Sequence, residues 1–151
     1  MIRIHYRSIL AVILAMVTTF LVSCSSPTAT KPPTYSPEKM AQIQKFATTV
    51  TELREQMPIL GNDIQKRDWT EVGSFIHGPF GELRQKMSYI TRELLPKEQP
   101  VAREAAKDLF IHLENIDAAS SSNNYQKAID NYRAALQDFD AFLQLIPKSS
   151  E

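Results

Sequence analysis

Metal chemistry in this sequence depends on two histidines and one carboxylate. Asp108 and His112 are four residues apart, so on a helix their side chains share one face and could hold a surface metal ion. Two ligands form a weak site, which indicates adventitious zinc or no metal rather than a dedicated zinc site. His77 directly precedes Gly78-Pro79 and is expected at a helix break, hydrogen-bonded to nearby backbone.

Other sequence patterns for catalysis or cofactor binding are absent. The chain contains no Glu-x-x-His pair for a di-iron centre, no Cys-x-x-Cys-His for haem, no glycine-rich phosphate loop and no nucleophile elbow. One cysteine, Cys24, excludes an internal disulfide framework and a zinc ribbon. We therefore expect no enzymatic activity, no intrinsic cofactor and no small-molecule substrate.

Cys24 follows a segment typical of a bacterial lipoprotein signal peptide. Basic residues occupy positions 3, 5 and 7, an unbroken apolar run covers positions 9–17, and Leu-Val-Ser precedes the cysteine. This pattern predicts cleavage after Ser23, so that residues 1–23 are removed, and lipidation of Cys24. A transmembrane anchor is the alternative, but the run is shorter than the ~20 residues that a spanning helix needs. Two or three acyl chains would attach the chain stably to a membrane.

The composition of the chain after residue 23 is typical of an ordinary single domain. Of 151 residues, 43% are hydrophobic, and 17 basic residues balance 17 acidic ones. Removing Arg3 and Arg7 with the signal peptide leaves 15 basic residues against 17 acidic ones, a net charge of −2. This balance argues against a nucleic-acid partner. Residues 24–36 contain three prolines and Tyr35 as their one aromatic residue, which predicts a lipidated N-terminus and an extended linker.

Residues 37–147 predict an all-α domain, followed by a short tail at 148–151. The first helix begins after Ser36 as N-cap, with Pro37 in its first turn, and continues to about residue 65 with a kink at Pro58. The second begins after Asp68 and bends at Gly78-Pro79. Apolar residues recur every three or four positions along both: Met40, Ile43, Phe46, Ala47, Val50, Leu53, Met57, Leu60 and Ile64, then Val72, Phe75, Ile76, Phe80, Leu83, Met87, Ile90 and Leu94.

The third predicted helix runs from Pro100 to the serines at 120–122, and the fourth begins after Asn123 or Asn124 and ends at Pro147. Their expected inner faces are Val101, Ala102, Ala105, Leu109, Leu113 and Ile116, then Tyr125, Ala128, Ile129, Tyr132, Leu136, Phe139, Phe142, Leu143 and Ile146. Short connections between long helices make neighbours antiparallel. The predicted fold is therefore an up-down-up-down four-helix bundle, preceded by the signal peptide and the proline-rich linker.

Antiparallel packing would divide the charges between the two ends of the bundle. Basic residues fall at the end nearest the linker: Lys39, Lys45, Arg92, Lys97 and Arg103, with Lys31 and Lys148 nearby. The opposite end carries Asp63, Asp68, Glu71, Glu114 and Asp117. Scattered lysines are often only a solvated face, but the linker holds this end toward the membrane. We therefore predict that Lys39, Lys45, Arg92, Lys97 and Arg103 bind a partner.

Short motifs along the whole chain resemble the cyanobacterial PsbQ family. They are the lipobox at Cys24, TYSPEK at 34–39, FIHGPFGELR at 75–84, LLPK at 94–97, HLE at 112–114 and DFDAFL at 138–143. The resemblance implies an extrinsic lipoprotein subunit of photosystem II on the lumenal face of the thylakoid membrane. It also implies a role in stabilising the oxygen-evolving complex and retaining its calcium and chloride. Calcium would then be associated only through the complex, whose core and other extrinsic subunits would be the partners.

Three function classes follow from these observations. The residues and the resemblance both indicate a non-enzymatic binding module tethered to a membrane. A periplasmic or lumenal metal-handling lipoprotein that binds zinc through His77, His112 and carboxylates is the chief alternative. An enzyme accessory without a detectable site of its own is the third.

Overall fold

The computed structural model describes residues 34–148, and within that range every regular element is helical. The elements are α2 (Pro37–Lys66), α3 (Trp69–His77), the short 3₁₀ helix η1 (Pro79–Gly81), α4 (Leu83–Glu93), α5 (Gln99–Ser121) and α6 (Tyr125–Gln144). The predicted all-α class is confirmed. The signal peptide, Cys24, the linker up to residue 33 and residues 149–151 lie outside the described residues. Within 34–148, no helix combines the length and the apolar character needed to cross a membrane.

Side-chain caps determine where three of the helices begin. Ser36, Asp68 and Asn124 each accept a hydrogen bond from the backbone N–H three residues further on, at 3.3, 3.3 and 3.0 Å. Each bond satisfies one of the N–H groups that a helix N-terminus leaves without a partner. Asn124 is thus the cap of α6, whereas Asn123 has left-handed backbone geometry with a φ of 54°.

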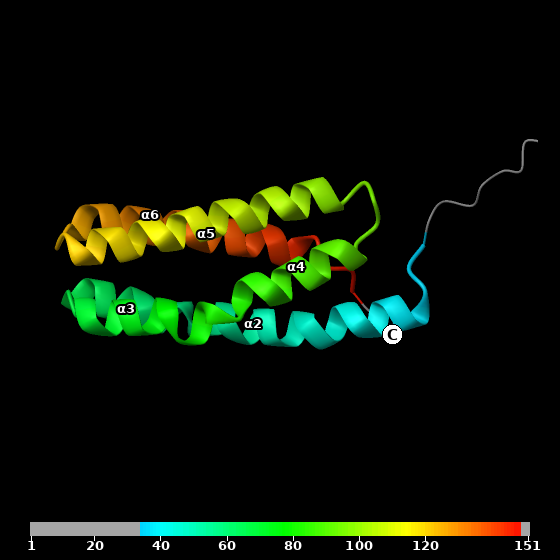
Figure 1. Ribbon diagram of the computed structural model, residues 1–151, viewed down its shortest axis with the longest axis horizontal. Helices are drawn as coiled ribbons and strands as arrows, with labels where there is room; N and C mark the ends of the chain where they lie inside the picture. Colours follow the sequence, from blue (N-terminus) through cyan, green and yellow to red (C-terminus); the bar gives the residue numbers. More distant parts are fainter. Residues whose placement is uncertain (1–33, 149–151) are drawn as a thin grey trace, which may run out of the picture. The chain divides into compact units, whose positions relative to one another are not determined.

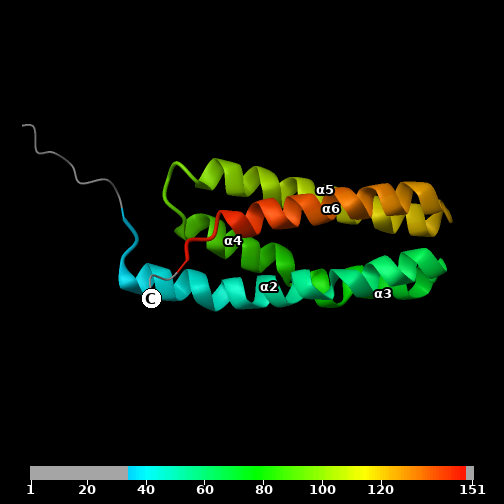
Figure 2. The ribbon, with the colours of Figure 1, turned by 180° about the vertical axis from the view of Figure 1, so that it is seen from behind.

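Four helical rods alternate in direction: α2 is the first, α3 with η1 and α4 is the second, α5 is the third and α6 is the fourth. In Figures 1 and 2, α2 runs along the bundle, α3, η1 and α4 return beside it, and α5 and α6 repeat the reversal. The packed pairs include α5 with α6, α2 with α4, α2 with α6, and α4 with α5. The predicted up-down-up-down four-helix bundle is therefore confirmed.

The second rod is broken where the sequence predicts it. α3 ends at His77, and Pro79 opens η1 before α4 begins. The break turns Phe80 into the core, where its ring lies edge-on to Phe75 at 5.0 Å and to Phe139 at 6.3 Å between centroids. Aromatic pairs in this arrangement stabilise a core beyond the area they bury.

α2 continues as one helix through Pro58, as predicted, and comes close to α6 one turn later. The Tyr132 hydroxyl of α6 donates a hydrogen bond to the Met57 carbonyl at 3.2 Å. Gly61 leaves room for this ring, because a Cβ atom there would lie 2.6 Å from the Tyr132 oxygen. The kink at Pro58 stays a prediction.

The core follows the predicted faces, and most of the differences lie on α5. Val101, predicted to face inward, is 56% exposed, while the neighbouring Ala102 is fully buried. Phe110 and Ala135 are buried although neither was in a predicted stripe. α5 also begins one residue before the predicted Pro100. The small side chains near the start of α5 face the core, and the larger valine faces solvent.

Tyr35 packs against the bundle before the first helix begins. Its hydroxyl donates to the Glu98 carboxylate and accepts from the Leu95 backbone N–H at 3.1 Å. Burial, followed by the hydrogen bond to Glu98, raises the pKa of Tyr35 to about 12. The last residues of the stretch predicted as a linker are thus bound to the α4–α5 connection.

Candidate functional site

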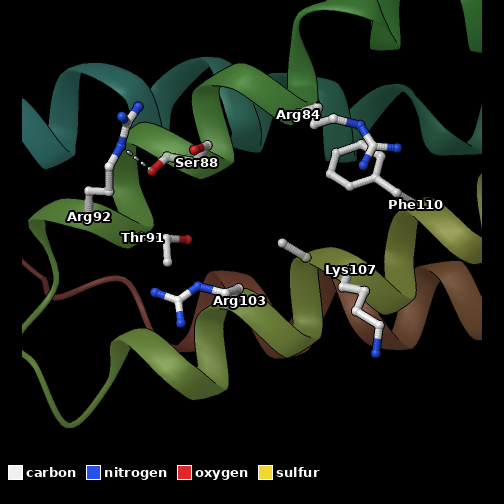
Figure 3. A pocket seen from close by; sticks show the side chains of 8 residues that line it. Arg84, Ser88, Thr91, Arg92, Arg103, Lys107 and Phe110 are labelled. Carbon is white, nitrogen blue, oxygen red and sulfur yellow. Dashed lines mark hydrogen bonds between the residues drawn. The ribbon is translucent and has the colours of Figure 1, made fainter.

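A groove of about 420 Å³ lies between α4 and α5. Figure 3 shows α4 along one side and α5 along the other, with Arg92 and Arg103 toward one end and Arg84 stacked near Phe110 at the other. We call this the basic groove, and it is lined by Arg84, Ser88, Thr91, Arg92, Arg103, Ala106, Lys107 and Phe110. Four of its eight lining residues are cationic.

Helical spacing places these side chains together. Arg103, Lys107 and Phe110 follow one another at intervals of four and three residues, so they share one face of α5. Arg84 and Ser88 have the same four-residue spacing on α4. Because the two helices are antiparallel neighbours, the two rows face each other across the groove.

Arg84 is held at one end of the groove by two contacts. Its guanidinium lies 4.1 Å from the centroid of the Phe110 ring, and its Nη2 donates to Glu114 Oε1 at 2.9 Å. Phe110 itself is only 8% exposed. Planar stacking combined with an ion pair restricts the arginine, so the groove has one fixed cation before any ligand arrives.

The remaining cations have different surroundings. Arg92 donates from Nε to the Ser88 carbonyl at 3.2 Å, and its guanidinium lies 4.8 Å from the Tyr89 centroid. Lys107 pairs with Glu104 at 2.8 Å, and this hydrogen bond is the main reason that the pKa of Lys107 is raised. Within residues 34–148, Arg103 forms no ion pair.

A second hollow of about 290 Å³ adjoins the basic groove and shares Arg84 and Phe110 with it. We call this the apolar hollow. Its other lining residues are Ile76, His77, Phe80, Gly81, Leu113 and Glu114. Along the seam between the second rod and α5 the number of Arg and Lys side chains falls, from four in the basic groove to Arg84 alone in the apolar hollow, where Ile76, Phe80 and Leu113 lie beside His77 and Glu114.

Two of the five residues predicted to bind a partner line the basic groove, namely Arg92 and Arg103. Lys97 is exposed in the adjacent connection between α4 and α5. Lys39, on the first turn of α2, lies 3.6 Å from Glu93, and Lys45 is exposed on α2. None of these three lysines lines the groove.

Arg84, Lys107 and Phe110 line the groove but were not among the residues predicted to bind a partner. A usable signal was present, because Lys107 and Phe110 continue the helical row that begins at Arg103. The predicted residues were chosen only by their position along the bundle axis. The direction in which each side chain points around the axis decides which residues line the groove.

Asp138 and Asn131 of α6 contact the ring of the predicted metal ligand His112. Nδ1 lies 3.0 Å from Asn131 Oδ1, and Nε2 lies 3.5 Å from Asp138 Oδ2. Burial raises the pKa of Asp138, the charge on His112 lowers it, and Asp108 raises it further. Asp108, the other predicted ligand, is thus close enough to act electrostatically on Asp138.

His77 differs from the prediction. Its Nε2 lies 3.3 Å from the Asp117 carboxylate of α5, rather than contacting nearby backbone. The break after α3 exposes the imidazole, whose side chain is 73% exposed, and it reaches across to the neighbouring helix. Within residues 34–148, no three His, Cys, Asp or Glu side chains are grouped so that they could hold a metal ion.

The basic groove has the chemistry of an anion-binding surface. Guanidinium groups bind carboxylates through paired N–H donors, and lysine adds a point charge. The hydroxyl of Thr91 donates to the Met87 carbonyl at 2.8 Å, which holds it to its own helix. The arrangement favours the binding of acidic groups.

Comparison with known proteins adds two findings. The family model described as "PsbQ: Oxygen evolving enhancer protein 3" matches residues 4–147. A protein named CyanoQ from Synechocystis sp. is 46% identical over 145 residues, which cover 95% of this chain and 97% of the relative.

Proposed function

Because the chain belongs to the PsbQ family, we propose that it is a non-enzymatic extrinsic subunit of photosystem II. The observation that carries the proposal is the family match, which extends from residue 4 to residue 147. It covers every helix of the bundle as well as Cys24. The match therefore concerns the whole predicted mature domain rather than a shared helical segment.

In this role the chain is a lipoprotein attached through Cys24 to the lumenal face of the cyanobacterial thylakoid membrane. The lipobox before Cys24 supports the attachment, and the family supports the lumenal side. Bound to the photosystem II core and to other extrinsic subunits, it stabilises the oxygen-evolving complex and slows the loss of its calcium and chloride. Calcium is associated with the complex and not with this chain alone.

The bundle is suited to such a role because it offers a preformed surface. Docking by rigid helices loses less conformational entropy than docking by a flexible segment. The basic residues of the α4–α5 end, Arg92, Lys97 and Arg103, together with Lys39 and Lys45 of α2, supply charges for an acidic partner surface. Such contacts weaken as salt rises, because exposed charges are screened over ~8–10 Å at physiological ionic strength.

Purification of oxygen-evolving photosystem II from cells that produce the chain tests the proposal. We expect the chain in the purified complexes, and we expect cells lacking it to lose oxygen evolution faster in medium depleted of calcium or chloride. Complexes without the chain, together with unchanged oxygen evolution in the deletion strain, would contradict the proposed function.

A Cys24→Ser variant tests the attachment separately. The substitution removes the one thiol in the chain, so it should abolish acylation and leave an unprocessed or soluble form. Acyl labelling that persists in the variant would contradict the assignment of Cys24.

A further inference from the structure

We propose that the basic groove and the apolar hollow together bind one extended peptide segment, in which acidic residues precede a large apolar residue. The groove would bind the carboxylates and the hollow would bind the apolar side chain. That the segment belongs to a photosystem II subunit rests on the proposed function. The recognition chemistry itself depends only on residues of this chain.

The basic groove is rich in cations. It combines Arg84, Arg92, Arg103 and Lys107, whereas residues 24–151 as a whole carry 15 basic and 17 acidic residues. Two of these cations have acidic partners, Glu114 for Arg84 and Glu104 for Lys107. The other two, Arg92 and Arg103, form no ion pair within residues 34–148 and lie toward the same end of the groove. That end is complementary to carboxylates supplied by a partner.

The lining of the basic groove is not only cationic, because Ala106 and the ring of Phe110 also belong to it. Past Arg84 the seam continues into the apolar hollow, where Ile76, Phe80 and Leu113 are the apolar lining and His77 and Glu114 are exposed beside them. A ligand that follows the seam meets cations first and apolar side chains afterwards. An extended peptide with acids followed by a Leu or Phe matches that order.

Two other occupants match the site less well. An anionic membrane would attract the same exposed cations, but a broad surface would not follow a groove that continues into a hollow lined by Ile76, Phe80 and Leu113. The chain's own C-terminal segment leaves α6 elsewhere, because Gln44 of α2 donates to the Pro147 carbonyl at 2.6 Å. A peptide of a partner is therefore the occupant that the observations favour.

The first test measures peptide binding to the full-length chain by fluorescence anisotropy. The probe is fluorescein-labelled Asp-Glu-Asp-Glu-Gly-Leu-Phe, and a matched peptide carries Asn and Gln in place of its acids. The R103E/K107E variant reverses two groove charges, and the A106W variant fills the groove without changing a charge. Exposed positions of α6 provide matched controls, K127E/R133E for the charge reversal and A141W for the added ring.

We expect R103E/K107E to weaken binding by about tenfold, since lost charged hydrogen bonds have that effect. A106W should weaken binding by a similar factor, because its ring would occupy the space of the bound peptide. Both control variants should stay within about twofold of wild type, and the amide peptide should bind more weakly than the acidic one. Equal losses in groove and control variants would overturn the proposal. So would a Kd above about 1 mM for wild type, or binding of phosphatidylglycerol vesicles that depends on Arg103 and Lys107 while the peptide does not bind. Circular dichroism would show that each variant keeps its helix content.

The second test locates the occupant in the assembled complex. A photoreactive benzoylphenylalanine in place of Ser88, on the wall of the groove, is activated in purified photosystem II. The control places it at Ser74, an exposed position of α3 that does not line the groove. Cross-linking of position 88 to an acidic peptide segment supports the proposal. A complex that contains the chain but links position 88 only to lipid or to a non-acidic surface would overturn it without affecting the proposed function.

Discussion

Replacing Gly61 by alanine should destabilise the protein, although Gly61 lies inside a helix. Replacing an interior helical glycine by alanine ordinarily stabilises a protein by about 0.5–1 kcal/mol. At Gly61, however, the new Cβ would lie 2.6 Å from the Tyr132 hydroxyl oxygen and 2.7 Å from the adjoining ring carbon. Tyr132 would have to swing away and lose its hydrogen bond to the Met57 carbonyl.

The magnitude follows from these opposing effects. The lost hydrogen bond costs about 0.5–1.5 kcal/mol, and the displaced ring costs roughly 1 kcal/mol at the low end of overpacking. Subtracting the helix-propensity gain leaves Gly61→Ala destabilising by about 1 kcal/mol. In a Tyr132→Ala background the obstacle is gone, so the same substitution should stabilise by about 0.5–1 kcal/mol.

Urea unfolding of the four proteins in this double-mutant cycle measures the change of sign. Gly73→Ala on α3 is the matched control, since its Cβ would lie 3.9 Å from the nearest atom, Asp117 Oδ1. We expect this control to be stabilising. If Gly61→Ala stabilises the wild-type chain as much as Gly73→Ala does, the close approach of α2 and α6 at Tyr132 is wrong.

Four further substitutions probe other parts of the fold. Tyr35→Phe should lower the free energy of unfolding by about 1–3 kcal/mol, because it removes both polar contacts with the α4–α5 connection; chemical denaturation measures the loss. Phe139→Ala should cost about 3–5 kcal/mol, because this side chain is fully buried, whereas Thr48→Ala on the exposed side of α2 should shift the unfolding midpoint little. The raised pKa of Asp138 means that the folded state holds its proton more tightly than the unfolded state. This contribution to stability is complete below the ordinary aspartate pKa and is lost as pH rises through the raised pKa. Asp138→Asn should therefore be more stable than wild type near pH 7, and the difference should vanish at about pH 3. If Asp138→Asn differs from wild type in stability by the same amount at both pH values, the pKa of Asp138 is not raised.

Local chemistry explains why most of the fold could be predicted from the sequence. Ser36, Asp68 and Asn124 cap helices because their oxygens accept from N–H groups only three residues away. Gly78-Pro79 breaks the second rod for an equally local reason. The failure at Val101 has a tertiary cause, since the first turn of α5 could turn either Val101 or Ala102 inward and packing selected the smaller residue.

The candidate site was only partly predictable because it lies between two helices. Arg92 and Arg103 were found from their position near one end of the bundle, but Lys39 and Lys45 share that height on another helix. Arg84 joins the groove through stacking on Phe110, which depends on how closely α4 and α5 approach. That distance is a property of the packed bundle and has no local signal in the sequence.

Tyr35 determines how mechanical load would pass through the domain. A pull on the chain before residue 34 would otherwise act on the first turn of α2 and peel it away from the bundle. The bonds of Tyr35 to Leu95 and Glu98 transfer part of that force directly to the α4–α5 connection, next to the basic groove. Force applied at the N-terminal side would therefore be shared between the first and second rods, and would reach the residues that we propose hold the partner.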